Sequence, residues 1–244
     1  MKQDSVIERA GESFFAHRLE NAIRYWEAST QADRSKTARL FTIALSGEAG
    51  TRETAVAQEV GRLLSWHVYD QELLEQIAQD MGVRTRLLES VDEREQSWIV
   101  EMMATVVSSS PEPADEAPQV TQSSYVHHLV KTVLALGTHG KCVIVGRGAA
   151  FILADATTLR VRLVAPVRER VTALARQLGI PEREAESRVS TIDRERTDFV
   201  QKHFRKDPAD PRNYDLVLNA ARLSVAQQAK LIVEALDAIE HPSA

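Results

Sequence analysis

The chain has 244 residues, 43% of them hydrophobic, which is enough to bury one sizeable core and excludes disorder throughout. Its net charge of −5 and pI near 5.9 argue against bulk binding of nucleic acid and leave room for a local basic pocket for a small anion. The single cysteine, Cys142, excludes an internal disulfide framework, and no apolar run approaches the roughly 20 residues of a membrane span. We therefore expect a cytoplasmic protein whose partners are small molecules, not nucleic acid or a membrane.

Residues 1–36 are predicted to form a helical extension ahead of the main domain, residues 37–244. Between about 5 and 28, apolar side chains recur mainly at three- and four-residue spacing, which is typical of an amphipathic helix or helix pair. The polar segment 29–36 then links this extension to the domain. The helix is a candidate for binding a partner or for self-association.

The first predicted strand, residues 39–46, leads into a turn and a helix that are laid out like a phosphate-binding loop. In the pattern G-x-x-x-x-G-K-[ST], backbone N–H groups surround phosphate, the lysine neutralises its charge and the hydroxyl residue holds Mg²⁺. Gly47 and Thr54 fit this pattern, whereas Arg52 replaces the second glycine and Glu53 replaces the lysine. The positive charge has therefore moved by one residue.

Two interpretations of this loop remain open. Gly50 and Thr51 keep the turn small, so the start of the following helix still offers unpaired donors to an anion. Arg52 is then the source of the missing charge, while a carboxylate at Glu53 repels phosphate. The other interpretation is a strand, a turn and an amphipathic helix that bind no ligand.

The rest of the chain alternates helices with strands. Helices are predicted at 53–64, 71–106 with interruptions, 124–136, 149–153, 167–177, 182–204 and 224–239, and strands at 66–69, 141–146, 159–165 and 214–219. Gly137 and Gly140 are predicted to form the turn before the third strand. The acidic, proline-rich residues 108–122 are predicted to be a mobile loop.

This alternation predicts a three-layer α/β/α domain whose parallel sheet is covered on both faces. Ligands of such sheets bind at the carboxyl ends of the strands. The phosphate-binding loop, Asp70 and Arg147 each follow a strand and meet at that edge. Arg147 stands between two glycines directly after an apolar strand, which favours a functional side chain over one that packs.

Such an edge suits phosphoryl transfer, which depends on positioning and on positive charge around the transition state. Residues 192–198 supply further arginines beside a proline-bounded loop, and residues of about 190–212 are predicted to act as a lid. The alternative for 192–198 is a solvated helix face that is stabilised by pairs of opposite charge.

Seven short motifs together resemble the bacterial cytidylate kinase-like family over residues of about 39–236. They are Ile43-Ala-Leu-Ser-Gly-Glu-Ala-Gly-Thr51, Ser65-Trp-His-Val-Tyr-Asp-Gln-Glu-Leu-Leu74, Val91-Asp-Glu-Arg94, Val143-Ile-Val-Gly-Arg-Gly-Ala149, Val161-Arg-Leu-Val-Ala-Pro166, Asp193-Arg-Glu-Arg196 and Tyr214-Asp-Leu-Val-Leu-Asn219. The resemblance implies the fold of P-loop nucleoside monophosphate kinases, with a helical insert at about 70–140. It implies phosphoryl transfer from ATP to CMP or dCMP, with Mg²⁺.

The resemblance also implies roles for individual residues. The ATP phosphates would be held by Gly47, Gly50, Thr51, Arg52 and Thr54, with Thr54 also a ligand of Mg²⁺. The monophosphate would be held by Asp70, Arg147, Asp193 and Arg196. Charge at the reacting phosphate would come from Arg52, Arg147, Arg194 and Arg196.

Two departures from the family pattern bear on activity. Authentic cytidylate kinases have a lysine where this chain has Glu53, and an aspartate where it has Gly148. Losing one charged donor to a transition state typically costs on the order of 3 to 4 kcal/mol. The sequence therefore leaves two hypotheses: a working nucleoside monophosphate kinase, and a nucleotide-binding pseudokinase with a sensing or scaffolding role.

Overall fold

A computed structural model describes residue 21 and the ranges 40–79 and 122–241. Its sheet has five parallel strands in the order β2-β3-β1-β4-β5. The strands are β1 (Thr42–Gly47), β2 (His67–Tyr69), β3 (Cys142–Val145), β4 (Thr158–Val164) and β5 (Leu216–Asn219). Because β1 lies in the middle, the loop that follows it leaves the sheet at its centre.

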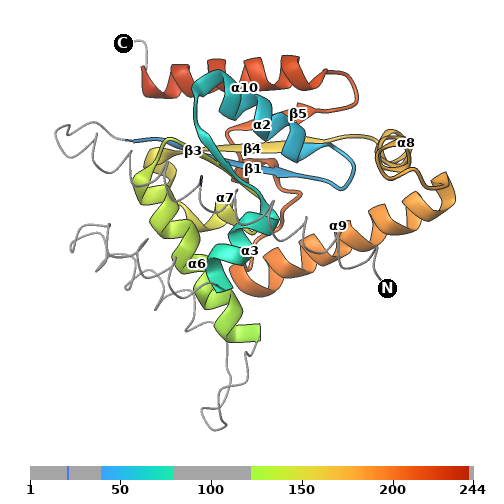
Figure 1. Cartoon of the computed structure of the whole chain (residues 1–244), viewed down its shortest axis with the longest axis horizontal. Coiled ribbons are helices and arrows are strands. Elements are labelled where there is room, and N and C mark those ends of the chain that lie inside the picture. The colour runs from blue at the N-terminus through green and yellow to red at the C-terminus, as the bar shows by residue number, and fades with distance from the viewer. Residues whose placement is uncertain (1–20, 22–39, 80–121, 242–244) are drawn as a thin grey trace, which may run out of the picture.

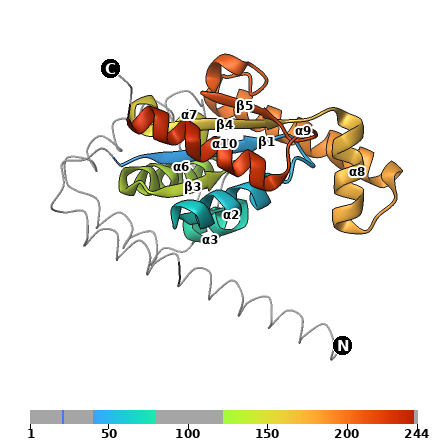
Figure 2. The same ribbon diagram turned by 90° about the horizontal axis from the view of Figure 1, so that it is seen from above.

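Helices cover both faces of the sheet (Figures 1 and 2). One face packs against α2 (Glu53–Leu64) and α10 (Val225–Glu240), and the other against α3 (Gln71–Gln79), α6 (Gln122–His139) and α7 (Ala149–Ile152). Near the carboxyl ends of the strands lie α8 (Val167–Leu178) and α9 (Glu182–Phe204), followed by a 3₁₀ turn at Pro211–Asn213. The predicted three-layer α/β/α architecture is confirmed.

Strand β1 shows why the sheet needs both layers. Ile43 and Leu45 belong to the core shared with α2 and α10, whereas Ala44 belongs to the core shared with α3 and α6. All three side chains are almost fully buried. Alternate residues of a strand point to opposite faces, so an uninterrupted apolar run is buried on both sides. Cys142 is likewise buried in β3, and burial raises the pKa of its thiol to about 12.

The predicted turn at Gly137 is wrong. Helix α6 continues through this residue to His139, and Gly140, with φ of +65°, ends it. A β-carbon at position 137 would lie 2.3 Å from Cδ2 of Leu153. Gly137 therefore lets α6 approach the segment after α7 closely, and only Gly140 supplies the left-handed turn.

Several sequence predictions lie outside the described residues. They are the extension 1–36, the part of the helical insert from 80 to 121, and nearly all of the loop 108–122. Within the extension, only residue 21 is described, and it is helical. The domain boundaries and the self-association of the extension therefore stay predictions. Across the described ranges, no helix is long and apolar enough to cross a membrane.

Candidate functional site

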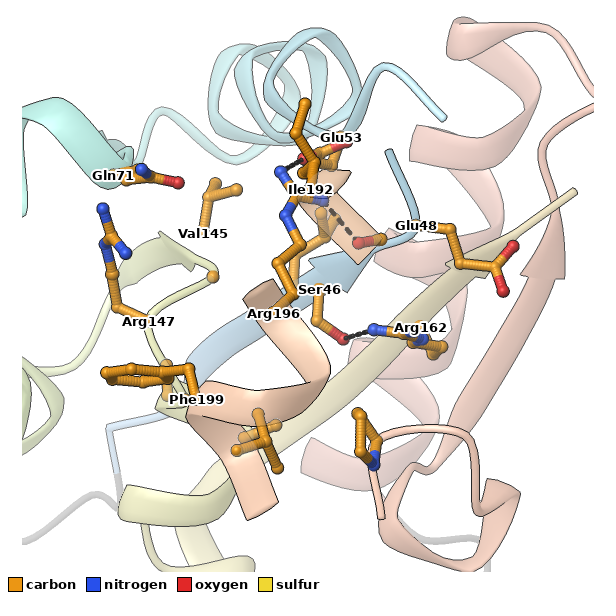
Figure 3. A pocket seen from close by; sticks show the side chains of 18 of the residues that line it. Ser46, Glu48, Glu53, Gln71, Val145, Arg147, Arg162, Ile192, Arg196 and Phe199 are labelled. Carbon is orange, nitrogen blue, oxygen red and sulfur yellow. Dashed lines mark hydrogen bonds and ion pairs between the residues drawn. The ribbon is translucent and has the colours of Figure 1, made fainter. Parts of the chain in front are cut away.

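A cavity of about 760 Å³ lies at the carboxyl ends of β1, β3 and β4 (Figure 3). Its walls come from the loop after β1, the start of α3, the loop after β3, one face of α9 and the segment before β5. Three arginines reach it from different elements: Arg147, Arg162 and Arg196. The segments that follow these strands were predicted to meet at one edge of the sheet, and in the structure they line one cavity.

Arg147 follows β3 in a left-handed stretch of backbone. Its φ is 50°, and Gly146 and Gly148 on either side have φ of 72° and 76°. The guanidinium pairs with Glu75 of α3, and its buried Nε has no hydrogen-bond partner among the described residues. Burial, helped by the nearby charge of Arg196, lowers the pKa of Arg147. A desolvated cation close to a second cation favours an anionic ligand.

Arg162 is a site residue that the sequence did not identify. It lies on β4 opposite Ser46 of β1, and its Nη1 is 3.5 Å from the Ser46 hydroxyl oxygen. Its guanidinium carbon is 5.8 Å from the centre of the Tyr214 ring, and its buried Nε has no hydrogen-bond partner within the described ranges. The available signal was a polar residue in an otherwise apolar strand. Arg160 is also a polar residue of this strand, and strand alternation places it on the same face as Arg162.

Arg160 does not line the cavity. Its side chain donates to the Leu153 carbonyl oxygen and pairs with Asp155, which closes the turn before β4. Strand alternation alone therefore did not tell the structural arginine from the one at the site.

The loop after β1, which the sequence predicts to bind phosphate, is held by the helices that face it. The backbone N–H of Ala49 donates to Asp193 Oδ1 of α9 at 2.8 Å, and Arg170 of α8 donates to Asp193 Oδ2 at 2.5 Å. Arg170 is only 5% exposed and also donates to the carbonyl oxygens of Ala49 and Ala165. Glu48 lies 3.3 Å from the same guanidinium. A buried arginine with several partners makes this loop rigid.

Glu53 points into the cavity, at the place where the ordinary pattern has lysine. Its side chain is 14% exposed. It accepts a hydrogen bond from Nη2 of Arg196 at 2.6 Å, and its other oxygen lies 3.1 Å from the Thr51 hydroxyl. Nη1 of Arg196 donates to the Gly47 carbonyl oxygen at 2.6 Å (Figure 3). Arg196 thus contacts both ends of the loop after β1.

Arg52 lies outside the cavity wall. It is exposed and adopts a left-handed conformation, with φ of 60°, just before α2. The glycine of the ordinary pattern takes this conformation without steric cost, whereas a side chain at φ above zero is disfavoured. Arg52 therefore keeps the backbone shape of the loop, while its side chain points elsewhere.

The structure brings part of the predicted site together. The predicted residues that line the cavity are Gly47, Thr54, Asp70, Arg147, Asp193 and Arg196, and those that do not are Gly50, Thr51, Arg52 and Arg194. Asp70 accepts a hydrogen bond from the backbone N–H of Leu73 and so caps the first turn of α3. Asp193 is bound by protein groups on both carboxylate oxygens. The chemical roles of all these residues stay predictions.

Within the described ranges, no group of three His, Cys, Asp or Glu side chains is placed to hold a metal ion. Mg²⁺ in phosphoryl-transfer sites takes few protein ligands and completes its shell with phosphate oxygens and water. Thr54 offers one hydroxyl at the cavity wall, so the residues present suit a Mg²⁺ that arrives with a nucleotide.

Comparison with known proteins gives one family and several partial relatives. The model of the cytidylate kinase-like family matches residues 42–222, more than half of the chain. A cytidylate kinase from Methanopyrus kandleri is 30% identical over 107 residues, which are 40% of this chain and 55% of that protein. A uronate isomerase from Corynebacterium glutamicum is 30% identical over 93 residues, 38% of this chain and only 18% of that protein.

Among solved structures, an uncharacterized protein from Eubacterium ventriosum superposes with a TM-score of 0.63 at 17% identity. The superposition covers 82% of this chain and 99% of that one. A likeness at such low identity concerns the fold alone. The chain spans about half or less of the length of the two curated relatives.

Proposed function

The chain belongs to the cytidylate kinase-like family, and we propose that it transfers a phosphoryl group from ATP to a nucleoside monophosphate, with CMP and dCMP as the first acceptors. In this reaction the bond between the γ-phosphorus of ATP and its bridging oxygen breaks. A new bond forms to a phosphate oxygen of the acceptor, giving ADP and a nucleoside diphosphate.

The observation that carries this proposal is the position of two arginines in the cavity wall. Arg147 and Arg162 each have a buried Nε without a hydrogen-bond partner in the described ranges, as does Arg160; unlike Arg160, they both line the cavity. A buried donor left unpaired costs roughly 1 to 3 kcal/mol, and more for a charged group. Phosphate oxygens would satisfy both donors at once, because guanidinium groups suit phosphate geometry.

The positions of the residues suggest how the work is divided. Arg147 lies beside α3, where the helical insert begins, and would hold the acceptor phosphate. Arg196 lies on the phosphate-binding loop and would face the phosphates of ATP. The start of α2 would offer its backbone N–H groups to the same phosphates. When bound, Mg²⁺ would neutralise charge on the transferring phosphate, with Thr54 as its protein ligand.

Glu53 favours the second candidate function, a nucleotide-binding pseudokinase that senses or scaffolds. Its carboxylate occupies the lysine's place in the cavity and cancels the charge of Arg196 locally. The loop therefore has less net positive charge than an ordinary phosphate-binding loop. Such a site would still bind nucleotides through Arg147 and Arg162 while turning them over slowly or not at all.

Turnover and binding assays separate these candidates. Purified protein with ATP, Mg²⁺ and each nucleoside monophosphate in turn should produce ADP and a diphosphate, fastest with CMP or dCMP. Calorimetry with ATP, CMP and both together provides the second measurement. Turnover supports the kinase, binding without turnover supports the pseudokinase, and no binding of any nucleotide contradicts both.

A further inference from the structure

We propose that Glu53 is a positioning residue, whose carboxylate holds the guanidinium of Arg196 on the phosphate-binding loop so that Arg196 supplies the charge of the missing lysine. This inference rests on the proposed nucleotide binding and deepens it. Glu53 is then part of the machinery that binds ATP.

The first support is the geometry of the contact. Arg196 spans the loop, with Nη1 on the Gly47 carbonyl oxygen and Nη2 on Glu53 Oε1, both at 2.6 Å. These distances are those of strong, charge-assisted hydrogen bonds. Gly47 and Glu53 are the first and the lysine-equivalent positions of the loop pattern. A guanidinium therefore lies where the pattern has the lysine, paired with Glu53 and supplied from 143 residues away.

The second support is that Glu53 is itself held in place. The Thr51 hydroxyl lies 3.1 Å from Glu53 Oε2 and 2.7 Å from the Glu48 carbonyl oxygen, so its single proton serves one of these two acceptors at a time. A β-carbon at Gly47 would lie 3.2 Å from Glu53 Oε2, so the carboxylate packs directly on the loop backbone. One carboxylate oxygen contacts the Thr51 hydroxyl and the other accepts from Arg196. The carboxylate thus has little freedom to turn toward a nucleotide.

The third support is the anchoring of α9. Asp193 lies three residues before Arg196 and binds both the Ala49 backbone and the buried Arg170. This contact fixes the helix against the loop one turn before Arg196. Residues three apart on a helix lie on the same face, so Arg196 meets the loop whenever Asp193 does. The anchor brings the arginine near, and Glu53 orients it.

Donors remain for a ligand. A guanidinium has five N–H donors, and the two bonds above use two of them. The Arg196 side chain is 37% exposed while that of Glu53 is 14% exposed. Both side chains line the cavity, and the arginine is the more exposed of the two.

The opposing interpretation makes the opposite prediction. If Glu53 only blocks the phosphate position, removing its charge should tighten ATP binding. If Glu53 positions Arg196, Glu53→Gln should weaken it, because the neutral amide holds a guanidinium less firmly. Two variants and their combination distinguish the two: Glu53→Gln, Arg196→Ala and the double variant.

The measurement is ATP affinity by calorimetry with the full chain. We expect Glu53→Gln to weaken ATP binding ~10-fold and Arg196→Ala to weaken it ~100-fold, as for the loss of a charge-assisted contact. The double variant should bind no more weakly than Arg196→Ala, because Glu53 acts through Arg196. Glu59→Gln is the matched control: it removes an acid from the same helix whose partner, Arg62, lies on that helix too.

The results of these binding measurements either support the inference or overturn it. Unchanged or tighter binding by Glu53→Gln overturns the inference, as does an equal loss from Glu53→Gln in the Arg196→Ala background. Thermal melting of every variant checks that the fold is kept, and Arg196→Gln replaces Arg196→Ala if the alanine variant is unstable. If the unaltered protein binds no nucleotide, the proposed function falls first, and this inference falls with it.

Discussion

Arg147 occupies a backbone position that glycine usually fills. Left-handed φ values at Gly146, Arg147 and Gly148 follow one another, and only the two glycines adopt them without cost. A non-glycine residue in this region typically costs about 1 kcal/mol or more and persists where the surroundings require it. Here the tight turn aims the guanidinium into the cavity beside Glu75.

Arg147→Lys should weaken binding of the acceptor nucleotide by about 10- to 100-fold, because lysine keeps the charge but loses the planar fork that matches phosphate. Calorimetry with CMP measures the effect. Arg188→Lys is the control, since Arg188 is an exposed arginine of α9 that pairs with Glu184 outside the cavity. Equal CMP affinity for Arg147→Lys and the unaltered protein would contradict the role of Arg147.

Arg52→Gly should stabilise the fold by about 1 kcal/mol, because glycine removes the cost of φ 60° at this position. Urea denaturation measures the change. ATP affinity should change less than in Arg196→Ala, because Arg52 does not line the cavity. A loss of ATP affinity as large as that of Arg196→Ala would instead show that Arg52 reaches the phosphates.

The sequence predicted the position of single residues better than the direction of their side chains. Arg147 was found because glycines and an apolar strand fix where it lies. The contact of Glu53 with Arg196 was not found, because it joins residues 143 positions apart and depends on the packing of α9. Arg162 was missed because its role also depends on tertiary packing. Strand alternation shows which face of the sheet a side chain is on, but not whether a cavity lies over that face.

At the scale of elements, α9 contacts the loop after β1 through Asp193 and Arg196. The predicted helix 182–204 is confirmed with the same ends. Its apolar residues predict that it packs, but only the structure shows that Asp193 binds the loop and α8. Phe204 at its carboxyl end meets Gly148, the position where authentic cytidylate kinases have an aspartate. That departure leaves room for the close approach of α9.

Gly148→Ala should destabilise the protein by about 1 to 3 kcal/mol more than Gly146→Ala. Both glycines have left-handed φ, but a β-carbon at 148 would lie 2.3 Å from Phe204 Cε2, whereas one at 146 would meet nothing within 4 Å. The comparison therefore isolates the contact with α9 from the backbone cost. Denaturation curves for the two variants measure it, and equal losses would mean that Phe204 moves aside freely.

At the scale of the whole molecule, the order, type and direction of the described elements were predictable. Strand and helix periodicities differ, and strands that alternate with helices form parallel sheets. Element ends were less predictable: β5 begins at Leu216, two residues after the predicted start. The Asp215 carboxylate instead accepts from the backbone N–H of Arg160 on β4, and the Tyr214 hydroxyl donates to the Pro208 carbonyl oxygen. Strand order required tertiary packing and could not be read from the chain.

Stability should fall as the pH decreases from about 6.5 to 4. Burial lowers the pKa of His139, at the end of α6, from 6.5 to about 4. The unfolded chain therefore binds a proton in this range that the folded chain does not, which favours unfolding by up to about 3 kcal/mol at the acid end. Above pH 6.5 this contribution is constant. His139→Gln should flatten the decline in urea titrations, and an unchanged pH profile would contradict it.

The central claim is that the cavity at the ends of β1, β3 and β4 binds nucleotide phosphates through its arginines. A crystal structure of the protein with ATP and CMP tests it most directly. We predict phosphate oxygens within hydrogen-bond distance of Arg147, Arg162 and Arg196, with Glu53 still bound to Arg196. Nucleotides bound elsewhere on the protein, or phosphates that approach Arg52 while this cavity stays empty, would contradict the claim.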